Sequence, residues 1–248
     1  MKTRKKVNVI SGELDVKVPT AWERLNQKEL AYIYFLLAKG VDKGMVKSLF
    51  FIRKAGMNPV KEVQPGIWFC QCGRSTCYVR VMDLAVGVQT LDWMDADPKV
   101  PIRLEEIHKA KAVNNVLHGV AFGDWLSMDN LFQGFIASKN PEALRDMAKY
   151  LYPGIDLKSL RDIDLYNISQ WYTQIKIFFA KKWPDLFSGS GDGGKFSPED
   201  SMNAMIRSLT GGDVLKENDV CRTVDVWRAL TELNQKAREA ADFKSKMS

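Results

Sequence analysis

The segment from Asp164 to Trp183 constrains the fold more than any other part of this 248-residue chain. Its apolar side chains recur every three or four residues, which is the spacing of one helix face. They are Leu165, Ile168, Tyr172, Ile175 and Phe179. Trp171 and Phe178 broaden this face further. Because so wide and aromatic a face is normally buried, we expect the helix to lie at the centre of the fold and to end at Pro184.

Helical spacing and helix-boundary residues predict further helices. Thr20 and Glu23 have the spacing of a capping box at the start of a short helix that carries Trp22. Asn140 and Pro141 suit the cap and first turn of another helix. The longer predicted helices span Asn26 to Gly40, Lys43 to Ala55, Asp83 to Met94, Leu104 to Leu117, Met128 to Ser138 and Glu142 to Leu151.

Two segments have the pattern of antiparallel strands. Val7 to Ile10 and Leu14 to Val18 are short β-favouring runs on either side of a Ser-Gly-Glu turn. From Ile67 to Val81, β-favouring residues flank a turn at Gly73 to Thr76, which predicts a second hairpin. The sequence therefore predicts a mainly α fold with one or two small antiparallel β-hairpins.

The composition changes sharply once along the chain, where seven consecutive residues read SGSGDGG. Such a stretch is typical of a flexible linker, which we place at residues 188–196. This predicts a helical body over residues 1–187, with its hairpin at about 67–81, and a helical C-terminal tail over residues 197–248.

The predicted tail contains two helices with apolar stripes. Ser197 and Pro198 begin the first helix, Gly211 and Gly212 end it, and a long helix follows from about Glu217 toward Lys244. The stripes include Met202, Met205, Ile206, Leu209, Trp227 and Leu230. These side chains are expected either to pack back on the body or to bind a partner as a helix in a groove, for which Met-rich faces are suited.

Bulk composition restricts the class of protein. Hydrophobic residues make up 46% and charged residues 27%, as in ordinary globular domains. No apolar run approaches the ~18–20 residues of a membrane span, and the run after the basic N-terminus is too short for a signal peptide. Four cysteines without a secretion signal suggest reduced thiols. We therefore expect a cytoplasmic protein without a membrane segment.

The net charge of +6 comes from 36 basic and 30 acidic residues. From Pro198 onward the chain has eight basic and nine acidic residues, so the excess lies before the linker. The basic terminus, Lys2 to Lys6, could contact nucleic acid, but a solvated terminus is the more common outcome. No nucleic-acid-binding motif or concentrated basic helix is present, so a nucleic-acid partner is not expected.

Cys70, Cys72 and Cys77 are the candidate metal ligands. Zinc requires four Cys or His ligands in a tetrahedron, and no fourth ligand is close in sequence. If Cys72 faces Cys77 across the hairpin, alternation places all three thiols with Trp68 and Val79 on one apolar face. Reduced cysteines behave as small buried hydrophobes, so a core-facing hairpin is favoured over a metal site, and no cofactor is predicted.

Other chemically active residues lack a catalytic arrangement. His108 and His118, if on one helix, would project about 80° apart with a rise of about 15 Å. Asp92, Asp95 and Asp97 cluster near a helix C-terminus, which could mark a cation or a basic partner but is more simply a solvated loop. The glycine-rich stretches lack the features of a phosphate-binding loop. We expect no enzymatic activity and assign no catalytic residue.

Several segments resemble a family of uncharacterised bacterial prophage proteins. They are residues 202–214 (MNAMIRSLTGGDV), 225–234 (DVWRALTELN), 236–239 (KARE), 119–123 (GVAFG), 130–135 (NLFQGF) and the helix over 171–183. The likeness spans most of the chain and brings no assigned catalytic residue. Relatives have no particular need for cysteines in the hairpin, which weakens the metal hypothesis further.

The resemblance implies a product of the tail-morphogenesis region of a phage genome. By analogy with tail assembly chaperones, it implies a non-enzymatic assembly protein that binds other phage proteins, such as the tape-measure protein. Two alternatives stay open: a minor structural component of the particle, such as a connector or tail-completion protein, and a DNA-associated protein of a mobile element. The sequence does not define the oligomeric state.

Overall fold

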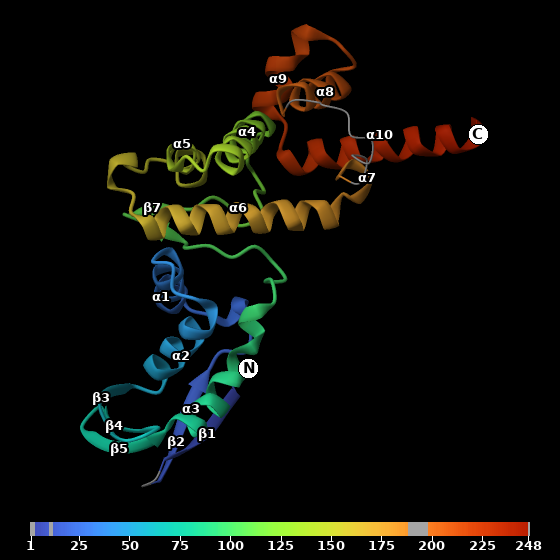
Figure 1. The fold of residues 1–248 in the computed structure, drawn as a ribbon. Helices are drawn as coiled ribbons and strands as arrows, with labels where there is room; N and C mark the ends of the chain where they lie inside the picture. The colour runs from blue at the N-terminus through green and yellow to red at the C-terminus, as the bar shows by residue number, and fades with distance from the viewer. Residues whose placement is uncertain (1–2, 10–11, 188–197, 248) are drawn as a thin grey trace. The chain divides into compact units, whose positions relative to one another are not determined.

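The chain folds into two compact units, which are described separately (Figure 1). Unit 1 is Met1–Ile102 and unit 2 is Arg103–Ser248. The computed structural model describes residues 3–9, 12–187 and 198–247. Both units carry helices, and the sheets are small and antiparallel, so the predicted mainly α fold is confirmed.

The boundary between the compact units differs from the predicted division into body and tail. It falls at residues 102 and 103, and the described part of the predicted tail belongs to unit 2. The predicted linker, residues 188–196, lies outside the described residues. No helix in the described ranges combines the length and the apolar composition needed to cross a membrane.

Unit 1 begins with a β-hairpin and alternates short helices with a second sheet. Its elements are β1 (Thr3–Val9), β2 (Gly12–Val18), the 3₁₀ helix η1 (Trp22–Arg24), α1 (Gln27–Ala38), α2 (Lys43–Lys54), β3 (Met57–Gln64), β4 (Ile67–Cys72), β5 (Ser75–Arg80), α3 (Val81–Val88) and the 3₁₀ helix η2 (Gln89–Asp95).

Local side-chain bonds set the helix starts of unit 1. The Asn26 side chain accepts a bond from the Glu29 amide, and the Glu29 carboxylate accepts one from the Asn26 amide, so the expected start of α1 is confirmed. The short helix predicted after Thr20 is a single 3₁₀ turn that begins after Ala21. Asp83 does not cap α3, because that helix already begins after Arg80.

The second sheet has the order β3-β4-β5. Cys70 lies opposite Cys77, so the predicted pairing of Cys72 with Cys77 is wrong by two residues. The tight turn consists of Gly73 and Arg74 alone. Gly73 adopts a positive φ of 64°, as two-residue hairpin turns require. An even shift keeps every side chain on its predicted face. The third strand, β3, was not predicted.

Unit 2 contains most of the helices in the described chain. Its elements are β6 (Glu106–Ile107), β7 (Ala110–Lys111), α4 (Phe122–Ser138), α5 (Pro141–Leu151), the 3₁₀ helix η3 (Leu157–Ser159), α6 (Asp162–Lys182), α7 (Pro184–Phe187), α8 (Pro198–Thr210), the 3₁₀ helix η4 (Val214–Lys216), α9 (Glu217–Thr223) and α10 (Val226–Met247).

Helix α6 is buried along its aromatic face, as the sequence predicts. Tyr172 contacts Phe132 of α4 with ring centroids 4.9 Å apart, and Phe179 contacts Trp183 at 5.0 Å. Ile168, Tyr172 and Ile175 are fully buried. Side chains from α4, α5 and α10 complete this core, so α6 is the helix around which unit 2 packs.

A closed ring of hydrogen bonds ties the segment before β6 to α5 and α6. The Asn167 side chain accepts from the Leu104 amide at 2.8 Å and donates to the Tyr152 hydroxyl at 2.8 Å. That hydroxyl donates to the Leu104 carbonyl at 2.7 Å. Asn167 and Tyr152 are fully buried, so the ring satisfies polar groups that have no access to water.

The helix predicted from Leu104 to Leu117 is absent from this described segment. Residues 106–107 and 110–111 form a minimal hairpin, with His108 and Lys109 at positive φ in its turn. A helix would use the Leu104 carbonyl and the following amides internally, whereas the ring with Asn167 holds this backbone in an extended path. Tertiary hydrogen bonding therefore overrides the local helical spacing.

The long helix predicted from Glu217 toward Lys244 is two helices, α9 and α10. Asp225 separates them: one carboxylate oxygen accepts from the Trp227 amide and the other from the Gly119 amide. The Phe122 amide donates to the Val224 carbonyl in the same place. These bonds join the starts of α4 and α10, so the break belongs to the packing of unit 2.

Replacing Asn167 with alanine tests the buried ring. Asn167→Ala leaves the Leu104 amide without its partner, and burying an unpaired polar group costs about 1–3 kcal/mol. We expect urea unfolding, followed by circular dichroism, to shift to lower urea by that order of free energy. Asn203→Ala on the exposed side of α8 is the matched control and should change little. Equal shifts would contradict this account.

Candidate functional site

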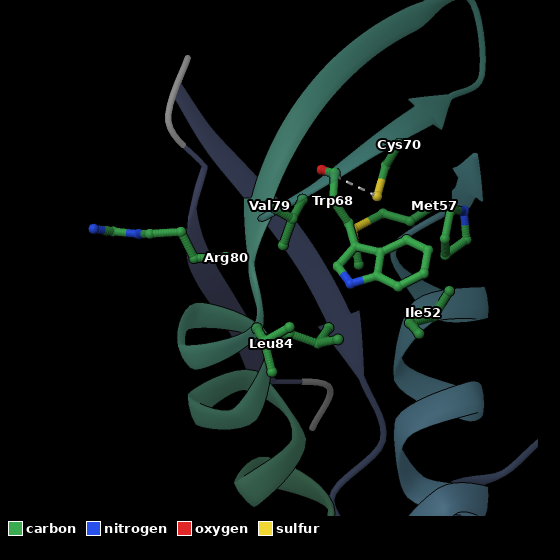
Figure 2. Close-up of a pocket in the computed structure, with 9 residues that line it drawn as sticks. Ile52, Met57, Trp68, Cys70, Val79, Arg80 and Leu84 are labelled. Carbon is green, nitrogen blue, oxygen red and sulfur yellow. Dashed lines mark hydrogen bonds between the residues drawn. The ribbon is translucent and has the colours of Figure 1, made fainter. Parts of the chain in front are cut away.

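Unit 1 contains a pocket of about 190 Å³ between its three-stranded sheet and helices α2 and α3 (Figure 2). Every element around it contributes apolar side chains. The lining residues are Ile52, Met57, Pro59, Trp68, Cys70, Val79, Arg80, Val81 and Leu84. The pocket is therefore suited to an apolar side chain rather than to a charged ligand.

Strand alternation explains why these residues meet. Trp68 and Cys70 lie two apart on β4, so they point to the same face of the sheet. Val79 is paired with Trp68 across β5, and Pro59 is paired with Cys70 across β3. A register irregularity after Pro59 then bends β3. The result is one apolar sheet face opposite α2 and α3.

Arg80 lines the pocket without charging its interior. Its guanidinium points away from the indole of Trp68 in Figure 2. Its Nε donates to the Asp83 carboxylate at 2.8 Å, one turn further along the chain. The charge is thus paired with Asp83 and directed away from the pocket.

Apolar side chains around the pocket are open to solvent. Trp68 is 37% exposed and Val81 is 45% exposed. On the same helix, α3, Met82 is 76% exposed and Val86 is 60% exposed. Single exposed apolar residues are common, but several on one short helix beside an apolar pocket form a candidate interaction surface.

Packing of α3 against α2 forms one wall of the site. Gly87 lies in α3, and a Cβ atom there would come within 2.5 Å of the buried Phe51 ring of α2. Only glycine permits this approach. Leu84, three residues earlier, lines the pocket together with Val81 of the same helix.

The three candidate metal ligands lie on the inner face of the sheet. Cys70 and Cys77 are buried and Cys72 is half-buried. The Cys72 and Cys77 sulfur atoms are 3.0 Å apart, while the Cys70 thiol donates to the Trp68 carbonyl at 3.8 Å. Within the described ranges, no three or more His, Cys, Asp or Glu side chains are grouped so that they could hold a metal ion.

Burial governs the ionisation of these thiols. Burial, with smaller contributions from the hydrogen bond to Cys72 and from the charges of Cys72 and Cys70, raises the pKa of Cys77 to about 12. Burial also raises the pKa of Cys70. Both thiols therefore remain protonated at neutral pH, as expected for packed interior residues.

The two histidines do not share a helix. His108 occupies the turn between β6 and β7, where its Nε2 lies 3.4 Å from the buried Asp164 carboxylate. His118 lies in the loop before α4 and stacks on Trp227 with ring centroids 3.8 Å apart. The single helix considered for both from the sequence is therefore not formed, and each histidine contacts a different part of unit 2.

Two acids of the cluster Asp92, Asp95 and Asp97 form ion pairs with a lysine side chain of unit 1. The Lys47 ammonium lies 2.9 Å from the Asp92 carboxylate and 2.5 Å from that of Asp95. Hydrogen bonding to Asp95, opposed by burial, raises the pKa of Lys47. These two acids thus anchor α2 to η2, which accounts for two of the three residues considered as a cation site.

The residues proposed to bind a partner through the tail divide into two groups. Leu230 is fully buried, and Trp227 contacts Trp183 with ring centroids 5.1 Å apart, so α10 packs inside unit 2. Met202, Met205 and Ile206 of α8 are half-buried and line open hollows of unit 2. Leu209 is half-buried as well. The α8 residues therefore remain the accessible part of the predicted surface.

Comparison with known proteins gives no relative. No family model, no curated protein and no solved structure matches the chain. The geometry of the site therefore carries the functional argument.

Sequence reasoning missed the pocket because it missed β3. That strand reads MNPVKEVQ, with a proline and three charged or amide residues after Asn58, and lacks clear alternation. A usable signal was present: β4 has an apolar inner face that a two-stranded hairpin alone cannot bury. Such a face requires another element, which β3, α2 and α3 provide.

The close approach of α2 and α3 can be tested at Gly87. Gly87→Ala should force the Phe51 ring to move and lower the thermal unfolding temperature, because overpacking typically costs about 1–3 kcal/mol. Gly134→Ala in α4 is the control, since nothing lies within 4 Å of its added Cβ and alanine favours helix by roughly 1 kcal/mol. The two substitutions are therefore expected to shift the unfolding temperature in opposite directions. Stabilisation by Gly87→Ala would refute the packing argument.

Proposed function

We propose that this chain is a non-enzymatic phage or prophage assembly protein that binds other proteins, in the manner of a tail assembly chaperone. The observation that supports this most directly is the apolar pocket of unit 1, with Trp68 and Val81 open to solvent at its edge. Burial of such surface is the usual source of protein–protein affinity. The resemblance of several segments to prophage proteins supplies the biological setting.

The occupant that fits best is an acidic amphipathic helix of the tape-measure protein. Unit 1 contains 16 basic and 10 acidic residues, whereas unit 2 contains 20 of each, so unit 1 carries the whole net charge of +6. An apolar side chain would enter the pocket while acidic flanks meet this positive unit. Charge complementarity of this kind raises association rates and selects partners.

Helix α8 is a second candidate contact for the same role. Met202 and Met205 line one hollow with Trp125 and Gln133 of α4, and Met205 also lines another with Phe187. Flexible methionine side chains adapt to varied apolar surfaces. Deletion of the tail is an unsuitable test, because it would remove Leu230 from the core of unit 2. Single substitutions at Met202 and Met205 avoid this.

The proposed docking site is tested with the full chain and the tape-measure protein encoded by the same phage genome. Val81→Asn places an amide at the pocket edge, and burying it unpaired costs about 1–3 kcal/mol. We expect the Kd, measured by calorimetry, to rise about tenfold. Val100→Asn changes the same residue type at a comparably exposed position of unit 1, outside both the pocket lining and α3, and should leave the Kd within about twofold.

Each alternative predicts a different result in this experiment. Equal Kd values for both variants would exclude the pocket and leave α8, which Met205→Asn then tests. No binding by the unmodified chain would overturn the chaperone proposal. Salt-sensitive retention of duplex DNA by the chain, without tape-measure binding, would favour the DNA-associated alternative. Recovery of the chain in purified particles would favour a structural component.

A further inference from the structure

We infer that Cys72 and Cys77 are a modification site, at which small-molecule disulfides such as oxidised glutathione convert the two thiols into a reversible intramolecular disulfide. This inference is independent of the protein-binding role. It follows from where the β4–β5 hairpin places its sulfur atoms.

The hairpin brings two of its three thiols into contact. Cys72 is paired with Ser75 and Cys77 with Cys70, so Cys72 and Cys77 are diagonal neighbours on the inner face of the sheet. Their sulfur atoms are 3.0 Å apart, and a disulfide requires about 2.05 Å. Closure therefore requires the two sulfur atoms to approach each other by about 1 Å.

Cys70 is held away from this reaction. Although it lies directly opposite Cys77, its thiol donates to the Trp68 carbonyl at 3.8 Å, within its own strand. Cys70 is 3% exposed and lines the apolar pocket. The structure therefore selects Cys72 as the partner of Cys77, although Cys70 is nearer to it in register.

The different exposure of the two thiols determines which one reacts first. Cys72 is half-buried, whereas Cys77 is 8% exposed, so a reagent in solution meets Cys72 first. The Cys72 thiolate attacks one sulfur of glutathione disulfide, forms a mixed disulfide and releases one glutathione thiolate. The Cys77 thiolate then attacks the Cys72 sulfur and releases the second glutathione. The two protein thiols are oxidised, lose two protons in total, and one glutathione disulfide is reduced to two thiols.

The second step should be slow at neutral pH. Burial holds the pKa of Cys77 high, and this cause persists after Cys72 has become a mixed disulfide and no longer bonds to Cys77 as a thiol. The thiolate is the attacking species, so the closure rate should rise about tenfold per pH unit below that pKa. The mixed disulfide at Cys72 should therefore accumulate near pH 7 and convert to the internal disulfide near pH 9.

Digestion of the full chain with trypsin allows the Cys72–Cys77 disulfide to be detected. Cleavage after Lys61, Arg74 and Arg80 separates Glu62–Arg74, which carries Cys70 and Cys72, from Ser75–Arg80, which carries Cys77. After incubation of the folded chain with oxidised glutathione, acid quenching and alkylation, mass spectrometry should detect these two peptides joined. Alkylation should mark Cys70 and Cys221 as free.

Serine variants identify the partners. Cys70→Ser and Cys221→Ser should retain the joined peptides, whereas Cys72→Ser should lose them. Cys77→Ser should trap the glutathione adduct at Cys72. Circular dichroism of each variant checks folding, and the pH dependence of closure is measured in the unmodified chain, which needs no variant. Joined peptides in Cys72→Ser, or their absence in the folded unmodified chain at pH 9, would overturn the inference.

Discussion

The alternation of side chains along β4 and β5 is the constraint on which the rest of unit 1 depends. It places Trp68, Cys70 and Cys72 on one face, and the tight turn at Gly73 sets which residues oppose them. That single face provides the floor of the apolar pocket and the contact between two thiols. A shift of one residue in this pairing would turn all of these side chains to the opposite face.

Much of the fold follows from local signals. The aromatic face of α6, the capping box of Asn26 and the cap at Asn140 are each set by residues within one or two turns. The face of each hairpin residue was predicted although the pairing was wrong by two, because parity depends only on alternation. Helix faces, helix caps and strand faces could therefore be predicted, because each is determined by a few neighbouring residues.

The pocket could not be predicted in the same way, because it depends on contacts distant in sequence. β3 is recognisable as a strand only once β4 lies beside it, and Gly87 matters only because Phe51 packs against it. The segment after Leu104 has helical spacing, yet bonds to Asn167, more than sixty residues away, hold it extended. Val224 likewise leaves the helical path where it bonds to Phe122.

The way in which charged groups are partnered agrees with the proposed role in binding another protein. The acids that could have formed a site are engaged: Asp92 and Asp95 hold Lys47, and the buried Asp164 bonds to Arg161. Around the pocket Trp68 and Val81 are exposed, and the exposed Arg80 is paired with Asp83. A surface with that character gains free energy by excluding water, which a partner helix can do and a small polar substrate cannot.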